Sequence, residues 1–185
     1  MLNSLFREEL SRLHARGTVK YDLKRRFVSF ASQALGSLLV HASTFDEELR
    51  QEVAGFPDGL VIGFSVLGDT VGFKLQCQSG RLIPAPQALP AKLEITFKHV
   101  EHAFLVLAAQ QSTPSAYASQ RLLTQGDPAL SLRFMRCLNR VQVMALPKSL
   151  AERAMKSVPD VPAREKARFL ARVWKASRSP VRSPA

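Results

Sequence analysis

The sequence predicts an α+β fold, in which helices cover a mostly antiparallel, five-stranded sheet and helical extensions stand at both ends. Two observations lead to this fold class. Near both ends, apolar residues recur every three or four positions, which is the period of a helix; between residues 60 and 97 they alternate, which is the period of a strand. The resulting order is helices, a run of strands, a helical excursion, a last strand and helices.

The first 54 residues are expected to form three helices. The first covers residues 2–16 and is expected to end at Gly17. The second covers residues 19–41, and the third covers residues 45–54 and begins with acidic residues, which suits the helix dipole. The apolar stripe of the second helix comprises Phe27, Phe30, Ala31, Ala34, Leu35, Leu38, Leu39 and Ala42. Its opposite, uncharged face comprises Ser29, Ser32, Gln33, Gly36 and Ser37.

Four strands are expected next, because apolar and polar residues alternate between turn-forming dipeptides. They cover residues 60–66, 71–77, 81–83 and 93–97. Gly68-Asp69 is the expected hairpin turn between the first two strands. Prolines between residues 84 and 90 exclude regular structure there.

Helical periodicity returns at residues 99–110 and 114–117, before a fifth short strand at residues 121–125. Gly126-Asp127-Pro128 predicts a helix start with Asp127 as the N-cap, and this helix is expected to reach about residue 145. Further helices are expected at residues 148–156 and 163–176, followed by a disordered tail.

Length and charge favour one globular domain with extensions over two full domains. The chain has 185 residues and a net charge of +11, divided as +4 in residues 1–44, +2 in 45–158 and +5 in 159–185. We expect a helical extension at 1–44, a globular domain at 45–158, and a basic helical tail at 159–185. Basic ends of this kind can bind an anionic membrane or nucleic acid.

Several classes of protein are not expected. Charged residues interrupt the first 16 positions, so no signal peptide is predicted, and no apolar run reaches the roughly 20 residues that span a bilayer. The expected location is the cytoplasm, with peripheral contact at the inner membrane. Cys77 and Cys137 are expected to be reduced core thiols.

No catalytic, cofactor or metal site is expected. His99 and His102 flank Glu101, but no third ligand follows at a useful spacing. The sequence contains no Gly-x-Ser-x-Gly nucleophile elbow and no glycine-rich phosphate loop. The chain is therefore not expected to be an enzyme.

The second half of the central region resembles the sterol carrier protein type 2 family. The resemblance lies in LEITFKHVEHAFLVLAAQQSTPSAYASQRLLTQGDPALSLRFMRCL and covers about residues 45–156. In that family, a strand ending in Thr-Phe leads into two short helices, a strand, and a Gly-Asp step into a long helix. Thr96-Phe97 and Gly126-Asp127 occupy these two positions here.

Within that family, the whole chain most resembles the UbiT type of bacterial accessory factor in oxygen-independent ubiquinone biosynthesis. The shared features are the helical N-terminal extension, the length, the stretch QRLLTQGDPALSL and the LPKSL step at Leu146. This resemblance implies a non-catalytic protein that holds an isoprenoid quinone precursor or an acyl lipid. It implies that the domain at 45–158 binds the lipid and that the extension at 1–44 acts as a lipid lid or a membrane contact. It also implies hydroxylases of ubiquinone biosynthesis as partners. On charge, we expect an anionic phospholipid such as phosphatidic acid over a zwitterionic one.

Two sets of candidate site residues follow. The candidate lipid cavity comprises Phe64, Phe73, Phe97, Phe134, Leu138, Val141, Phe30 and Leu38, for which a closed core is the alternative. The candidate headgroup or membrane contacts are Lys20, Lys24, Arg25, Arg26, Arg133, Arg136 and Arg140. The three arginines between residues 133 and 140 could equally form a solvated helix face. Whether the 19–41 helix packs on the domain or contacts membrane stays open.

Two other functions remain open. The basic ends would suit a nucleic-acid-binding module, although no helix-turn-helix or RNA-recognition signature is present and nucleic acid is the less expected partner. The helical ends would also suit a scaffold that docks partner enzymes.

Overall fold

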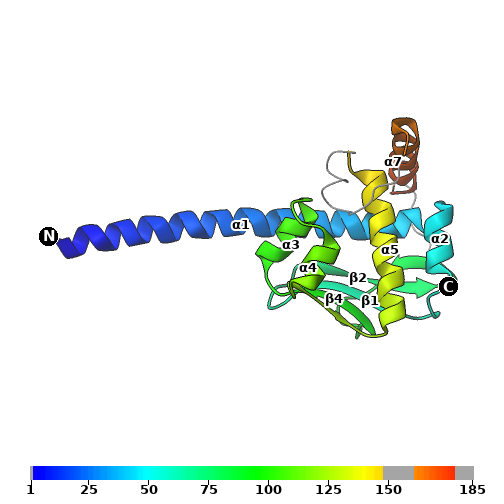
Figure 1. The fold of residues 1–185 in the computed structure, drawn as a ribbon, viewed down its shortest axis with the longest axis horizontal. Helices are drawn as coiled ribbons and strands as arrows, with labels where there is room; N and C mark the ends of the chain where they lie inside the picture. The colour runs from blue at the N-terminus through cyan, green and yellow to red at the C-terminus, as the bar shows by residue number, and fades with distance from the viewer. Residues whose placement is uncertain (1, 148–160, 178–185) are drawn as a thin grey trace.

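The structure is a computed structural model that describes residues 2–147 and 161–177, with side chains described for residues 20–147 and 161–176. The helices are α1 (Leu2–Ala42), α2 (Glu47–Val53), α3 (Val100–Leu107), α4 (Thr113–Ala118), α5 (Pro128–Ala145) and α7 (Ala163–Ser177). The strands are β1 (Val61–Val66), β2 (Gly72–Gln78), β3 (Arg81–Pro84), β4 (Leu93–Phe97) and β5 (Leu122–Gln125). Figure 1 shows α1 running across the domain and projecting beyond it at its N-terminal end.

The five strands form one sheet in the order β3-β2-β1-β4-β5. The pairs β1–β2, β2–β3 and β4–β5 are antiparallel, whereas β1 and β4 run parallel, with Phe64 opposite Ile95. The chain turns between β1 and β2 at Gly68, whose φ of 72° lies in the left-handed region that favours glycine. The predicted fold class, a mostly antiparallel five-stranded sheet with helices, is confirmed.

One face of the sheet is apolar and covered, and the other is polar and more open. Along β2, buried residues alternate with partly exposed ones, as expected for a strand with one covered face. Helix α1 packs against β2 and β3 and also against α3, α5 and α7. On the open face, the Ser65 hydroxyl donates to the Glu94 carboxylate at 2.8 Å and lies 3.1 Å from the Thr96 hydroxyl.

Helix α1 differs from the sequence prediction in extent. The structure has one helix from Leu2 to Ala42, so the predicted stop at Gly17 is wrong. A single glycine in a helix interior costs only about 1 kcal/mol relative to alanine, and helix-compatible residues continue on both sides. A glycine alone is therefore a weak signal for a helix end.

The buried face of α1 agrees with the predicted stripe at Leu35, Leu39 and Ala42 but differs from it elsewhere. Val28, Ser32, Gly36 and Leu39 are buried, whereas Phe30 is 74% exposed. Ser32 and Gly36, placed by the sequence on the outer face, therefore point inward. The reason is close packing: a Cβ on Gly36 would lie 3.0 Å from Cγ of Phe73, so only a very small residue fits where α1 crosses β2.

The later elements follow the predicted order. The Asp127 side chain caps α5 by accepting from the backbone N–H groups of Ala129 (2.7 Å) and Leu130 (3.1 Å), as predicted. Helix α7 agrees with the helix expected at 163–176. The helix expected at 148–156 and the tail beyond residue 177 lie outside the described residues.

A single apolar core joins α1, the covered sheet face, α5 and α7. Leu39 from α1, Phe97 from β4, Phe134 from α5 and Phe169 from α7 all belong to it. The boundary expected between residues 44 and 45 therefore cuts through this core and does not separate two packing units. None of the described helices combines the length and the apolar character needed to cross a bilayer.

Candidate functional site

The candidate cavity residues of the sheet and of α5 meet beneath α1. Phe64 stacks on Phe73, with ring centroids 5.0 Å apart and an interplanar angle of 3°. Phe64 also meets Phe97 edge to face at 5.5 Å. The residues of this set that are buried together in the core are Phe64, Phe73, Phe97, Phe134, Leu138 and Val141. They form a filled apolar layer between the sheet and the helices.

The two candidate cavity residues of α1 lie elsewhere. Leu38 is partly buried and packs against the core, whereas Phe30 points to the outer surface. Since α1 buries Val28, Ser32 and Leu39, Phe30 falls on the opposite side of the helix. Phe30 is therefore corrected from a cavity residue to a surface residue.

An open groove leads from the surface to Phe73. It has a volume of about 260 Å³ and is mostly apolar. Its lining residues are Gln33, Gly36, Ser37, Val40 and His41 of α1, and Phe73, Lys74, Leu75 and Pro84 of the sheet. Burial lowers the pKa of His41 at this rim, which favours the neutral imidazole. Sequence reasoning missed this groove, and the one available signal was a glycine inside a helical pattern.

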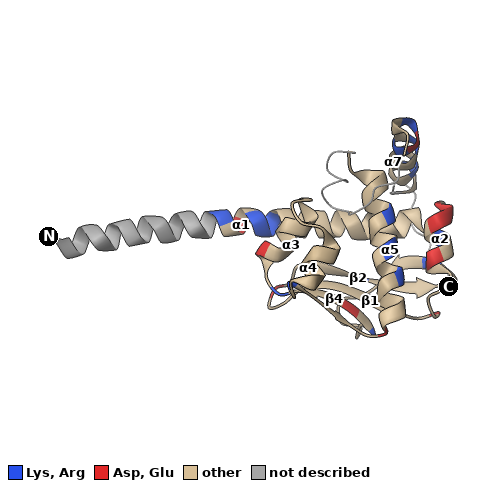
Figure 2. Ribbon diagram, in the orientation of Figure 1, with Lys and Arg blue, Asp and Glu red and all other residues tan. Residues whose placement is uncertain are grey.

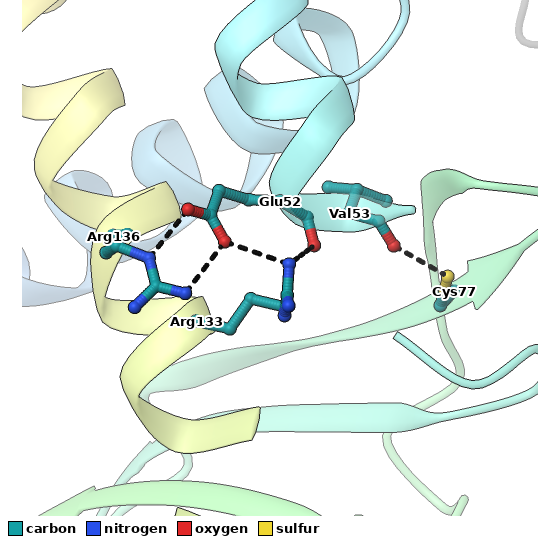
Figure 3. A network of polar contacts seen from close by, with 5 residues as sticks. All are labelled: Glu52, Val53, Cys77, Arg133 and Arg136. Carbon is teal, nitrogen blue, oxygen red and sulfur yellow. Dashed lines mark hydrogen bonds and ion pairs between the residues drawn. The ribbon is translucent and has the colours of Figure 1, made fainter. Parts of the chain in front are cut away.

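The arginines of α5 form ion pairs with α2. Glu52 accepts from Nε of Arg136 at 2.6 Å and from Nη1 of Arg133 at 3.1 Å (Figure 3). Arg140 pairs with Asp46 at 3.0 Å and with Glu48 at 3.1 Å.

These contacts fix the charge state and the role of the cluster. The hydrogen bond from Arg136 lowers the pKa of Glu52. Cys137 lies in the hollow between α2 and α5 that these arginines also line. Burial raises the pKa of its thiol to about 12, which makes the thiol unreactive. Arg133, Arg136 and Arg140 are thus paired with carboxylates of the protein, and these ion pairs join α5 to α2. Their expected role as headgroup contacts stays a prediction.

The four basic residues of α1 between positions 20 and 26 divide into two pairs. Lys24 pairs with Glu101 at 2.8 Å, and Arg25 pairs with Asp69 through two hydrogen bonds of 2.8 and 2.9 Å. These contacts fasten α1 to α3 and to the β1–β2 turn, where basic and acidic segments meet in Figure 2. Among the described residues, Lys20 and Arg26 are exposed and make no ion pair.

The histidines do not form a metal site. His99 and His102 lie edge to face with ring centroids 5.2 Å apart. Burial lowers the pKa of His102, and its Nδ1 has no hydrogen-bond partner among the residues whose side chains are described. Within residues 20–147 and 161–176, no three His, Cys, Asp or Glu side chains are grouped to hold a metal ion.

No protein-family description and no curated protein matches the chain. Among solved structures it is similar to a protein described as UbiJ-SCP2 ubiquinone synthesis protein, at 15% identity and a TM-score of 0.43, covering 64% of this chain and 98% of that one. It is also similar to sterol carrier protein domain 2 of Helicoverpa armigera, at 12% identity and a TM-score of 0.44, covering 59% and 85%. A conserved hypothetical protein of Thermus thermophilus, described as possibly a sterol carrier protein, aligns at 15% identity and a TM-score of 0.40, covering 68% and 89%.

Proposed function

We propose that this chain is a non-catalytic lipid-binding accessory protein that holds a lipid chain between α1 and the sheet. The observation that carries the proposal is the apolar groove between α1 and β2, which ends on the aromatic layer at Phe73. A groove with apolar walls and a few polar groups at its mouth suits a lipid chain. Ser37, His41 and Lys74 supply those polar groups.

The size of the groove indicates how a lipid would enter. Ligand pockets usually measure about 300–1,000 Å³, and this groove, at about 260 Å³, lies just below that range. A long chain therefore requires α1 and Phe73 to move apart. Gly36 has no side chain at this contact, so α1 contributes no side-chain atoms there to hold it closed.

The proposed ligand is an isoprenoid quinone precursor or an anionic phospholipid such as phosphatidic acid, and the proposed setting is oxygen-independent ubiquinone biosynthesis. The sequence resemblance to the UbiT type supports this setting, and hydroxylases of that pathway are the proposed partners. Leu23, Phe27 and Phe30 are exposed on α1 with Lys20 and Arg26 beside them, which supports a peripheral contact with an anionic membrane.

Native mass spectrometry and lipid extraction of the purified protein test the proposal. We expect a bound lipid in the unchanged protein, and less of it in Ser37→Trp, which fills the groove from an exposed position. The matched control is Phe30→Trp, which places the same side chain on α1 away from the groove. A protein that carries no lipid and takes none up from vesicles would contradict the lipid-binding role.

The pathway is tested separately. Deletion of the gene should lower ubiquinone in cells grown without oxygen and leave it unchanged in cells grown with oxygen. Equal quinone levels without oxygen would overturn the assignment to this pathway and leave lipid binding untouched.

A further inference from the structure

We propose that helix α7 docks on the surface of an anionic bilayer through a face that is half basic and half apolar. Helix α7 stands on the other side of α1 from the sheet in the view of Figure 2, where its Lys and Arg positions are marked. The proposal does not depend on lipid being held between α1 and the sheet. It names a membrane surface as the partner of a different part of the molecule.

The inner side of α7 is fixed on the domain. Phe169 is 3% exposed and meets Phe45 edge to face at 5.5 Å. Lys166 Nζ donates to the Leu146 carbonyl at 2.8 Å. These contacts set the rotation of the helix about its axis, so its outer face is defined.

Four cations occupy one half of that outer face. Arg164, Arg168, Arg172 and Lys175 follow at spacings of four, four and three residues, which places them on one side of a helix. All four are exposed. Arg172 lies 5.7 Å from the ring centre of Phe45, and none of the four makes an ion pair within the part of the chain that the structure describes.

Apolar residues occupy the other half. Ala167, Leu170, Ala171 and Trp174 are all exposed, with 42% of Leu170 and 63% of Trp174 accessible. Cations beside Leu and Trp suit the interface of an anionic bilayer, where the headgroups take the charge and the acyl region takes the apolar side chains. The phosphates of a nucleic acid could bind the cations, but a nucleic acid has no apolar region in which Leu170 could be buried.

The electrostatic attraction to an anionic bilayer therefore comes mainly from α7 and less from α1. Helix α1 has four basic residues between positions 20 and 26, but Lys24 and Arg25 are already neutralised by Glu101 and Asp69. Only Lys20 and Arg26 remain there without a described carboxylate partner, against four cations on α7.

Binding to vesicles tests the proposal. The probes are vesicles of phosphatidylcholine alone and of phosphatidylcholine mixed equally with phosphatidylglycerol, measured by flotation. The unchanged chain should bind only the anionic vesicles. The triple variant R164Q/R168Q/K175Q should bind them on the order of 100-fold more weakly, from about 1 kcal/mol per basic residue near the surface.

The matched control removes the same charge elsewhere. R50Q/R81Q/K98Q changes three cations outside α7 and should keep most of the binding. L170S should weaken binding without changing charge. Since Trp174 is the one tryptophan of the chain, its emission reports contact directly: we expect a blue shift with anionic vesicles that is absent in the α7 triple variant. Circular dichroism of each variant confirms that it is folded.

Three results would overturn the proposal. The first is no binding, and no Trp174 shift, of the unchanged chain with anionic vesicles. The second is an equal loss in the α7 triple variant and the control, which would mean that net charge alone acts. The third is tight, salt-sensitive binding to duplex DNA or RNA that L170S leaves intact while vesicles do not bind. None of these results bears on lipid held at the groove, so the lipid-binding role and the membrane contact of α7 can fail separately.

Discussion

At the scale of single residues, Glu52 is the side chain on which the α2–α5 contact depends most. One carboxylate serves two arginines from another helix, and about a quarter of its side chain is exposed, so water screens the pairs only in part. Loss of Glu52 would leave Arg133 and Arg136 without that partner at the same time.

The substitution Glu52→Gln should therefore lower the free energy of unfolding by about 1–2 kcal/mol, because charge-assisted hydrogen bonds to both arginines are weakened. Urea unfolding at neutral pH measures this. Glu47→Gln is the control, since Glu47 is exposed and its two described partners, Arg50 and Gln51, each at 3.4 Å, lie within its own helix. An equal loss in both variants would contradict the role of these ion pairs in joining α5 to α2.

The ionisation of Glu52 makes the free energy of unfolding depend on pH. The pKa of Glu52 in the folded protein lies below its ordinary value of 4.5, so the stabilisation is complete above 4.5 and is lost as the pH falls through the lower, folded pKa. The unchanged protein should therefore lose more stability than Glu52→Gln between about pH 5 and pH 2. If the free energies of unfolding of the two proteins changed equally with pH, Glu52 would not contribute to the pH dependence of stability.

At this scale, the sequence contains the charges but not their pairing. Asp46, Glu48 and Glu52 lie about 90 residues before Arg133, Arg136 and Arg140. Only the fold brings the two sets together, because α2 and α5 are neighbours in space. Without that neighbour, an arginine stripe has the same pattern whether it faces solvent, a lipid headgroup or a carboxylate.

At the scale of elements, strands were predictable and the rotation of α1 was not. The strands alternate because one face of the sheet is covered, and β2 follows that pattern residue by residue. For α1, the prediction weighted large apolar side chains and turned Phe30 inward. Close approach to Phe73 selects a small residue instead, so Gly36 faces the sheet and Ser32 is buried. Hydrophobic periodicity alone does not indicate where a close contact requires a small residue.

The close contact between Gly36 and Phe73 can be tested by replacing Gly36 with a larger residue. Gly36→Leu should lower the free energy of unfolding by roughly 1–3 kcal/mol, because the added side chain overpacks a site where even a Cβ is tight. Ser37→Leu, one residue further along the same helix but exposed, should change it by less than about 0.5 kcal/mol. Chemical denaturation compares the two. If Ser37→Leu were the more damaging, the rotation assigned to α1 would be incorrect.

The packing of α7 on the domain is also tested by substitution. Phe169→Ala should lower the free energy of unfolding by about 3 kcal/mol, since it removes a buried ring from between α7 and Phe45. Leu170→Ala, on the exposed side, should have little effect. Urea titration of both variants distinguishes a docked α7 from one that only touches the domain, for which the two losses would be similar and small.

At the scale of the whole molecule, the ends of the chain differ in how they join the core. The basic tail contributes Phe169 to the core, and the later part of α1 contributes Val28 and Leu39. The earlier part of α1 extends away from the domain (Figure 1). Among the described side chains of α1, Lys24 is the first with a hydrogen bond to another element, and residues 20–23 are exposed. The packed unit therefore begins within α1 and not after it.

Truncation tests where that unit begins. Removal of residues 1–19 should leave the free energy of unfolding within about 0.5 kcal/mol of the full chain, because it spares every described contact of α1. Removal of residues 1–30 also deletes Val28, which is fully buried, and the ion pairs of Lys24 and Arg25. That loss should exceed about 2 kcal/mol, since burial of a valine side chain alone contributes roughly 1.5 kcal/mol or more. Urea unfolding followed by Trp174 fluorescence measures both. A large loss from the shorter truncation would mean that residues 1–19 stabilise the domain, and the unit would then include all of α1.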